Sequence, residues 1–573
     1  MRAPRLRSAW TTTRKVGAHV LGAACVVAVA LLAQHAPDGP EPEAAPRAVD
    51  VDPGETTLVC PSPARLVQED VGDDEFDATP VETESGLRIT AAEPVVTGLI
   101  GSDEGDDGTA GSEGDATVDD STIDGGESDS DGDDDGDDDG DDDGDGDDGE
   151  SDSTGDGDAD STGDGSESES DSENESLSAP DPAQVVRAAP GEFAAATATS
   201  VTTEGDLRGL VAGACREPAI EHWLVGGSTD IGSSARLVLQ NPGRTAASVS
   251  LAVWGPAGPV TLGGKALVVV PPGEQVETTL EAIAPGQPRI AVHATSQGGR
   301  INAYVQHHRI DGLVPQGADL IAPGTAPSSS QTVTGIVSDG ESMDDPHAPQ
   351  LRLLAPGERD GSARISIYGA DGQTWLRGVE DVALQAGAVT DVPLGGLPEG
   401  GYTLAVDATV PVVSAGVTHS PGETTGDPVI DETPYDTAWI PARPITAEPA
   451  GPLAVPENTS WSLSIAALPE DRSDDTRPAG TADVTITGYA PDGSATGTSG
   501  LALPAGEAAR LTPDDLVPLG DDVAAVAVTS ASGTPVAWSL HLAADDDSLV
   551  AVLAPPEPGT TAGRTQVRSI VAE

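Results

Sequence analysis

Three histidines recur at one position of a repeated sequence, and their type and spacing could do chemistry. Each ends the pattern Ala-x-x-x-His near the end of an expected strand, as His307, His419 and His541. If the copies packed with threefold pseudo-symmetry, the imidazoles could converge on a metal ion. In a linear array they would lie far apart. The favoured interpretation is a histidine hydrogen-bonded locally at each strand end, so we name no metal ligand.

A second metal-like pattern lies in an acidic tract. Asp131, Asp133 and Asp135 precede Gly136, with Asp142 at the twelfth position, which matches the pattern of a calcium loop. Any tract this rich in Asp and Gly matches that pattern, and no expected helices flank it. We therefore expect diffuse screening by divalent ions rather than a specific calcium site.

Sequence motifs for catalysis are not found. The chain has no G-x-S-x-G, H-E-x-x-H, C-x-x-C or phosphate loop. Acidic pairs are too common here to nominate a glycosidase pair. Five tryptophans could form a sugar-stacking face, although core anchoring is favoured because only 2% of the residues are aromatic; they are Trp254, Trp375, Trp439, Trp461 and Trp538. We nominate no catalytic residue and no cofactor.

The histidines are carried by an internal repeat of roughly 110–120 residues, a period that fits a complete sandwich domain. Two further landmarks recur in the same order. They are an aromatic residue before a turn (Trp254, Tyr368 and Tyr489) and a turn glycine (Gly273, Gly387 and Gly506). Short alternating runs separated by Gly and Pro indicate strands. The repeat therefore predicts an all-β chain with three tandem immunoglobulin-like β-sandwich domains.

Within the first copy, six strands are expected. They are 235–240, 247–254, 266–270, 275–280, 289–295 and 300–307. Proline-containing connectors also recur, and they are interpreted as edge strands or as linkers between domains. They are 320–323, 439–441 and 552–555, with a similar run at 58–61.

The cysteines predict one disulfide. Cys25 lies in an apolar N-terminal run, which leaves Cys60 and Cys215 as the only pair in the rest of the chain. In an oxidising compartment these two are expected to pair, and the alternative is two free thiols. The bond would make residues near 60 and 215 part of one folded unit, with the acidic tract as an insertion.

Charge is distributed very unevenly along the chain. The formal net charge is −70, from 97 Asp and Glu against 27 Lys and Arg. Between Gly101 and Pro180 there are 35 acidic residues and no basic residue. With almost no apolar side chains, this tract is expected to be disordered and extended by self-repulsion. The overall charge excludes a general nucleic-acid binder.

The N-terminus has the pattern of an export signal. Five basic residues precede an uncharged apolar run over 16–33, long enough as a helix to approach the thickness of a bilayer. Basic residues before the run orient the rest of the chain outside the cytoplasm. A membrane anchor is slightly favoured, and the alternative is a cleaved signal peptide with a loose site near Ala36.

These observations divide the chain into seven expected parts. They are a basic N-terminus (1–15), a membrane or signal segment (16–33), an extracytoplasmic segment with strands (34–98), the acidic insertion (99–182), a first sandwich (183–325, with strands from 51–70), a second (326–445) and a third (446–573).

Several motifs in the first copy resemble a known family. They are Leu58–Pro61, Leu237–Gly243, Val253–Gly258, Val269–Gly273, 291–296 and Tyr304–His308, together with Cys215. The chain from about Val51 onward resembles the actinobacterial exported proteins grouped as the family of unknown function 5719. The acidic insertion departs from that pattern. The resemblance implies an envelope-associated extracytoplasmic protein, with no known catalytic residue to transfer.

The leading functional hypothesis is a non-enzymatic cell-envelope protein, held by its N-terminal helix in the membrane or secreted, that presents an interaction surface to an envelope protein or glycan. One alternative is a carbohydrate-binding or accessory module, which requires an exposed aromatic platform. Another is a hydrolase with a site between domains, which requires converging carboxylates.

Overall fold

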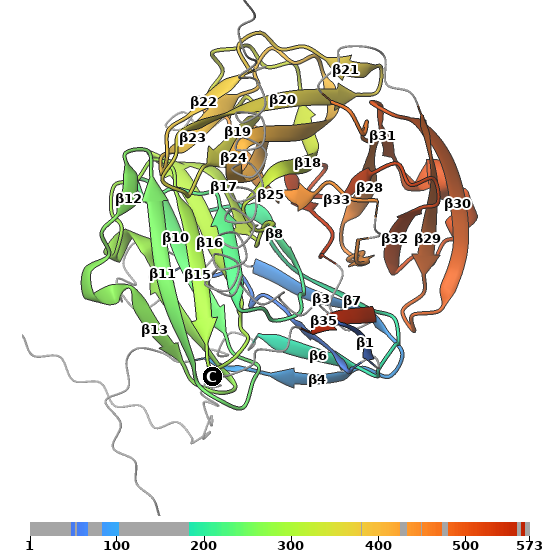
Figure 1. Ribbon diagram of the computed structural model, residues 1–573, viewed down its shortest axis with the longest axis horizontal. Helices are drawn as coiled ribbons and strands as arrows, with labels where there is room; N and C mark the ends of the chain where they lie inside the picture. The colour runs from blue at the N-terminus through green and yellow to red at the C-terminus, as the bar shows by residue number, and fades with distance from the viewer. Residues whose placement is uncertain are drawn as a thin grey trace, which may run out of the picture. The chain divides into compact units, whose positions relative to one another are not determined.

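Strands make up nearly all of the regular structure that the protein shows (Figure 1). The computed structural model describes residues 47–51, 54–66, 83–101, 183–379, 381–424, 432–447, 450–472, 480–557 and 563–567. The helices in these ranges are three short 3-10 segments, η1 (Gly263–Lys265), η2 (Leu280–Ala282) and η3 (Pro513–Leu519). None of them is long and apolar enough to cross a membrane. The expected membrane segment, calcium pattern and acidic tract lie outside the described residues.

The first repeat is built from two sheets that enclose an aliphatic core. One sheet has the strand order β17-β16-β10-β14-β5, and the other β12-β11-β15-β9 with β13 also paired to β11. Their bounds are β5 (Ile100–Gly101), β9 (Glu221–Val225), β10 (Ser233–Gln240), β11 (Ala247–Gly255), β12 (Gly258–Val260), β13 (Leu267–Val270), β14 (Glu274–Thr279), β15 (Ala291–Gln297), β16 (Asn302–Asp311) and β17 (Val314–Ile321). The six strands expected from the sequence are all present, and β5, β9, β12 and β17 are additional.

The second repeat uses one very long strand in both of its sheets. The first part of β24 pairs with β18 and β20, and its last part pairs with β19 and β25. The strands are β18 (Ser328–Ser338), β19 (Gln350–Leu354), β20 (Gly361–Gly369), β21 (Gly372–Thr374), β22 (Val382–Leu384), β23 (Val389–Pro393), β24 (Gly400–Pro421), β25 (Tyr435–Pro441) and β26 (Arg443–Pro444).

The third repeat returns to two separate sheets, in the orders β27-β32-β29-β30 and β31-β28-β33-β34. Its strands are β27 (Leu453–Ala454), β28 (Ser460–Ala467), β29 (Thr481–Tyr489), β30 (Ala495–Pro504), β31 (Ala508–Leu511), β32 (Ala525–Ser530), β33 (Val536–Ala544) and β34 (Leu549–Leu553). The pairing of the main strands is thus equivalent in the three copies.

The recurring turn glycines have one backbone role in all three copies. Gly273, Gly387 and Gly506 have φ of 79°, 74° and 87°, a region that disfavours residues with a Cβ atom. Each donates its N–H to a backbone carbonyl that follows or ends an earlier strand, at Asn241, Ala355 and Ala467 respectively. The repeated glycine therefore fixes the same turn before the same strand.

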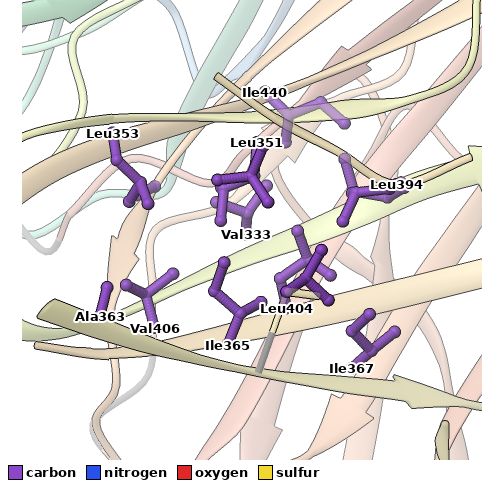
Figure 2. Packing of buried hydrophobic residues seen from close by; sticks show 14 of the residues in the cluster. Val333, Leu351, Leu353, Ala363, Ile365, Ile367, Leu394, Leu404, Val406 and Ile440 are labelled. Carbon is purple, nitrogen blue, oxygen red and sulfur yellow. The ribbon is translucent and has the colours of Figure 1, made fainter. Parts of the chain in front are cut away.

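The cores consist mainly of Val, Leu, Ile and Ala. In the second repeat, Ile365, Leu404 and Val406 from one sheet face Leu351 and Ile440 from the other (Figure 2). Every second side chain of β20 and β24 points into this core, and most of the side chains between them are buried as well. A composition with few aromatic residues is thus sufficient to fill thin two-sheet layers.

The N-terminal strands form two small sheets of their own, which corrects their expected placement in the first sandwich. The orders are β2-β6-β4 and β3-β7-β8, and only β5 joins the first repeat. The bounds are β2 (Thr56–Val59), β3 (Thr83–Ala91), β4 (Val95–Gly98), β6 (Gln184–Ala188), β7 (Ala194–Thr202) and β8 (Gly209–Ala214). The first repeat already has all the strands of its two sheets, so these segments pair with one another. A further pair joins β1 (Arg47–Val51) to β35 (Gly563–Val567).

A disulfide between Cys60 and Cys215, the pair named from the sequence, joins these two small sheets. The neighbouring backbones also pair, because Val59 and Arg216 exchange both N–H···O bonds. Leu58, Val186 and Ala196 pack around the bond. Residues near 60 and 215 therefore belong to one folded unit.

The described residues on the two sides of the tract lie at adjacent positions. Gly98 pairs with Gln184, and the Leu99 N–H donates to the Ala183 carbonyl at 2.8 Å. Strands β4 and β6 are thus direct antiparallel neighbours, which a loop of a few residues could connect. The fold needs no particular length of chain between them.

We therefore expect a chain in which residues 103–181 are replaced by a four-residue Gly-Ser linker to fold normally. Shortening this connection lowers its closure entropy, so the free energy of unfolding should stay equal or rise by up to about 3 kcal/mol. Urea unfolding of the two chains measures the difference. A shortened chain that unfolds at markedly lower urea would show that the tract supports the fold.

Candidate functional site

Four strands, one from the N-terminal unit and one from each repeat, contact one another in turn at the boundaries between these parts. They are β8, β17, β25 and β34. Each lies at the end of its sheet, and none forms a ladder with the others. Figure 1 shows β8, β17 and β25 at this meeting point. Three of them contain or precede the repeated proline connectors, which are therefore edge strands, although deeply buried ones.

Asp436 on β25 binds three of these strands together. Its carboxylate accepts the backbone N–H of Leu210 on β8 at 3.0 Å, of Val550 on β34 at 2.8 Å and of Thr437 beside it at 2.8 Å. The side chain is fully buried, and burial raises its pKa to about 6. The carboxylate supplies the acceptors that a neighbouring strand would otherwise provide.

Asp319 on β17 does the same for a second group of strands. It accepts the Trp439 N–H of β25 at 2.6 Å, and backbone groups of Leu320 and of Ala212 on β8 also hydrogen-bond to it. Burial, with the nearby charge of Asp436, raises the pKa of Asp319 well above its usual value. Neither aspartate could be singled out from the sequence, because isolated acidic residues are common in an acidic chain.

Two of the three repeated histidines, His307 and His541, are buried and His419 is partly buried, and each has its own partner. The Ser228 N–H donates to Nε2 of His307 at 3.2 Å, Nδ1 of His419 lies 3.0 Å from Thr437 Oγ1, and Nε2 of His541 lies 2.9 Å from Ser464 Oγ. No group of three metal-ligating side chains occurs in the described ranges. Burial lowers the pKa of each imidazole to about 3. They stand as local hydrogen-bond partners.

The five tryptophans considered as a sugar-stacking face do not lie on one surface. Trp439 and Trp538 are buried, Trp254 and Trp461 are partly buried, and Trp375 is 55% exposed. Trp254 stacks on the buried Trp223, a residue not singled out from the sequence. Core anchoring therefore describes most of them.

The structure brings two of the three histidines to one cavity between the second and third repeats. His419 and His541 line a space of about 520 Å³ together with Trp461, Arg510, Asp339 and Asp547. Arg510 Nε donates to Ser462 Oγ at 3.0 Å, and Ser460 Oγ donates to Asp547 at 3.1 Å. The walls thus combine one aromatic ring with charged and hydroxyl groups, a mixture that suits a polar organic ligand.

The buried groups predict opposite pH responses. A histidine whose pKa is about 3 in the folded state costs no stability above pH 6.5. As the pH falls, the unfolded state binds a proton that the folded state does not, and this lowers the free energy of unfolding by about 2 kcal/mol per histidine at pH 5. We expect His541→Gln to lose about 2 kcal/mol less than the wild type between pH 7 and pH 5. Asp436, whose pKa is raised in the folded state, contributes more to the free energy of unfolding as the pH falls. Asp436→Asn should therefore lose about 1 kcal/mol more than the wild type between pH 7 and pH 5.

Urea unfolding of the three proteins at pH 7 and at pH 5 measures these changes in the free energy of unfolding. If the wild type and His541→Gln lose the same free energy of unfolding between pH 7 and pH 5, the imidazole is not buried in its neutral form.

Comparisons with known proteins place the chain in a family. Residues 169–514 match the family of unknown function DUF5719. No curated protein matches the chain. No solved structure matches it either. The matched residues include β6 to β31 and every repeated landmark except His541, which lies on β33. The chain belongs to the family of unknown function DUF5719.

Proposed function

We propose that the protein is a non-enzymatic, extracytoplasmic cell-envelope protein whose three repeats are immunoglobulin-like β-sandwiches. The observation that carries the proposal is the use of the buried ionisable side chains. Asp319 and Asp436 accept backbone N–H groups from other parts of the fold, and the three repeated histidines are hydrogen-bonded locally.

Strongly shifted pKa values often mark catalytic groups, but buried structural groups shift as well. A general acid or base must reach a proton of its substrate through a free lone pair or N–H. Both carboxylates are buried and receive hydrogen bonds from strands, so their shifted pKa values have a structural explanation. The arrangement supports a rigid scaffold that presents its outer surface to a partner.

The proposed location is supported by the sequence and by the disulfide. The basic and apolar N-terminus has the order of an exported chain, with 1–15 inside and the bulk outside. Disulfides persist in oxidising compartments, and Cys60 is bonded to Cys215. The surface charge of an acidic chain is compatible with a protein or glycan partner and unfavourable for nucleic acid.

Alkaline phosphatase fused after Glu573 tests export, because this enzyme is active only after its own disulfides form. We expect activity from the full-length fusion and none from a matched fusion that lacks residues 1–45. Activity in both fusions, or in neither, would contradict the proposed location.

Intact mass of the purified native protein distinguishes an anchored from a secreted form. A full-length mass is expected for an anchor, and a mass beginning after about Ala36 for a secreted protein. In either form, Cys60 and Cys215 should alkylate only after reduction.

A second candidate function, saccharide binding, is supported by the cavity between the second and third repeats. Trp461 offers a ring face beside hydroxyl and charged groups, which is how proteins hold sugars. Titration with neutral and acidic tetrasaccharides should quench the fluorescence of the wild type and of Trp375→Phe but not of Trp461→Phe. Equal quenching in both variants would place any binding elsewhere.

A further inference from the structure

A second cavity, of about 370 Å³, lies beside the disulfide, and none of the three repeated histidines lines it. Its wall includes Arg216, Arg300, Arg443, His222 and Asn302. Its volume is within the range of small-ligand sites. Arg216 directly follows the disulfide cysteine Cys215, so the bond fixes the backbone from which this side chain projects.

Two guanidinium groups meet at this wall on a single carbonyl oxygen. Arg216 Nη1 donates to the Pro323 carbonyl at 3.3 Å, and Arg443 Nη1 donates to the same oxygen at 3.0 Å. Arg443 also donates to the carbonyls of Pro555 and Ala554. Most N–H groups of Arg443 are therefore used to join strand ends, whereas Nε of Arg216 is buried without a partner.

This pair of cations has no ion-pair partner in direct contact among the described residues. Within the described ranges, no carboxylate lies within 4 Å of either guanidinium. Burial and then the charge of Arg443 lower the pKa of Arg216, and burial lowers that of Arg443 to about 10. Arg443 is buried and Arg216 is half-buried, and two guanidinium groups held this close together repel each other unless an anion binds beside them.

Three carboxylates line the same cavity. Glu221 is engaged with the indole N–H of Trp223 at 3.0 Å and with His293 at 2.9 Å. Glu217 also has a partner. Glu557 is the acidic neighbour whose charge raises the pKa of both arginines, from beyond ion-pair distance. It lies where it would compete with an incoming anion.

We propose that this cavity binds the oxyanion group, a carboxylate or a phosphate, of a small ligand, held chiefly by the guanidinium group of Arg216 with Arg443 behind it. Guanidinium groups bind such oxyanions through paired N–H donors. The guanidinium pair is a local positive site within a cavity that also contains carboxylates, so binding selects anions small enough to reach this wall.

Equilibrium dialysis of the full chain with radiolabelled inorganic phosphate, at constant ionic strength in sodium chloride, tests the proposal. We expect one phosphate per chain and displacement of it by glucuronate, since both present an oxyanion to the same guanidinium pair. Arg216→Gln should weaken phosphate binding about 10- to 100-fold, the usual effect of a lost hydrogen bond to a charged group. Arg244→Gln, at an exposed position, is the matched control and should bind as the wild type does.

Glu557→Gln gives an independent test in the opposite direction, because removing the competing carboxylate should tighten phosphate binding several-fold. Thermal unfolding of each variant without phosphate verifies that it is folded. The proposal is overturned if the wild type binds no phosphate, or if Arg216→Gln and Glu557→Gln both bind it with unchanged affinity.

Discussion

The fold depends on how four edge strands satisfy their outward backbone N–H groups after they are buried against one another. A buried N–H without an acceptor is costly, and β8, β17, β25 and β34 form no ladder with each other. Asp319 and Asp436 provide the acceptors, each receiving N–H groups from more than one strand. Glycine permits the close approach, since a Cβ on Gly209 would lie 2.7 Å from the Ala318 carbonyl oxygen and one on Gly317 would collide with the Thr437 N–H. Buried carboxylates that cost desolvation thus replace a continuous sheet.

The three repeats share one strand pairing but have diverged where they meet. The histidine of each copy keeps its place on the strand, yet His307 lies edge-on to Trp439 of the next repeat, while His541 packs close to Gly335 of the preceding one. Arg352 of the second repeat adds a contact that is not repeated, because its Nη1 donates to the Gly227 carbonyl of the first repeat while a bidentate bond to Asp391 holds the guanidinium in place. Repeats of similar sequence therefore hold each other through contacts that differ from one boundary to the next.

Much of the architecture could be predicted from local pattern, and most of the inter-repeat contacts could not. Alternation and turn glycines predicted the strands of the first copy, because each depends on neighbouring residues along the chain. The pairing of Cys60 with Cys215 could be named because no other cysteine pair was available. Other features depend on residues that are far apart in the sequence. They are the separate sheets of the N-terminal unit, the role of Asp436 and the meeting of Arg216 with Arg443. In the sequence, Asp436, Arg216 and Arg443 look like any other acidic or basic residue.

The adjacency of Gly98 and Gln184 has an evolutionary consequence. The two ends of the tract join neighbouring positions of one antiparallel strand pair. A change in the length of the tract therefore leaves the register of the strands on either side unaltered. Insertions and deletions there are shielded from selection on folding, so the tract can lengthen, shorten or exchange its composition among descendants while the disulfide and the repeats remain unchanged. Its acidity can thus be tuned to the surroundings of the protein independently of the scaffold that carries it.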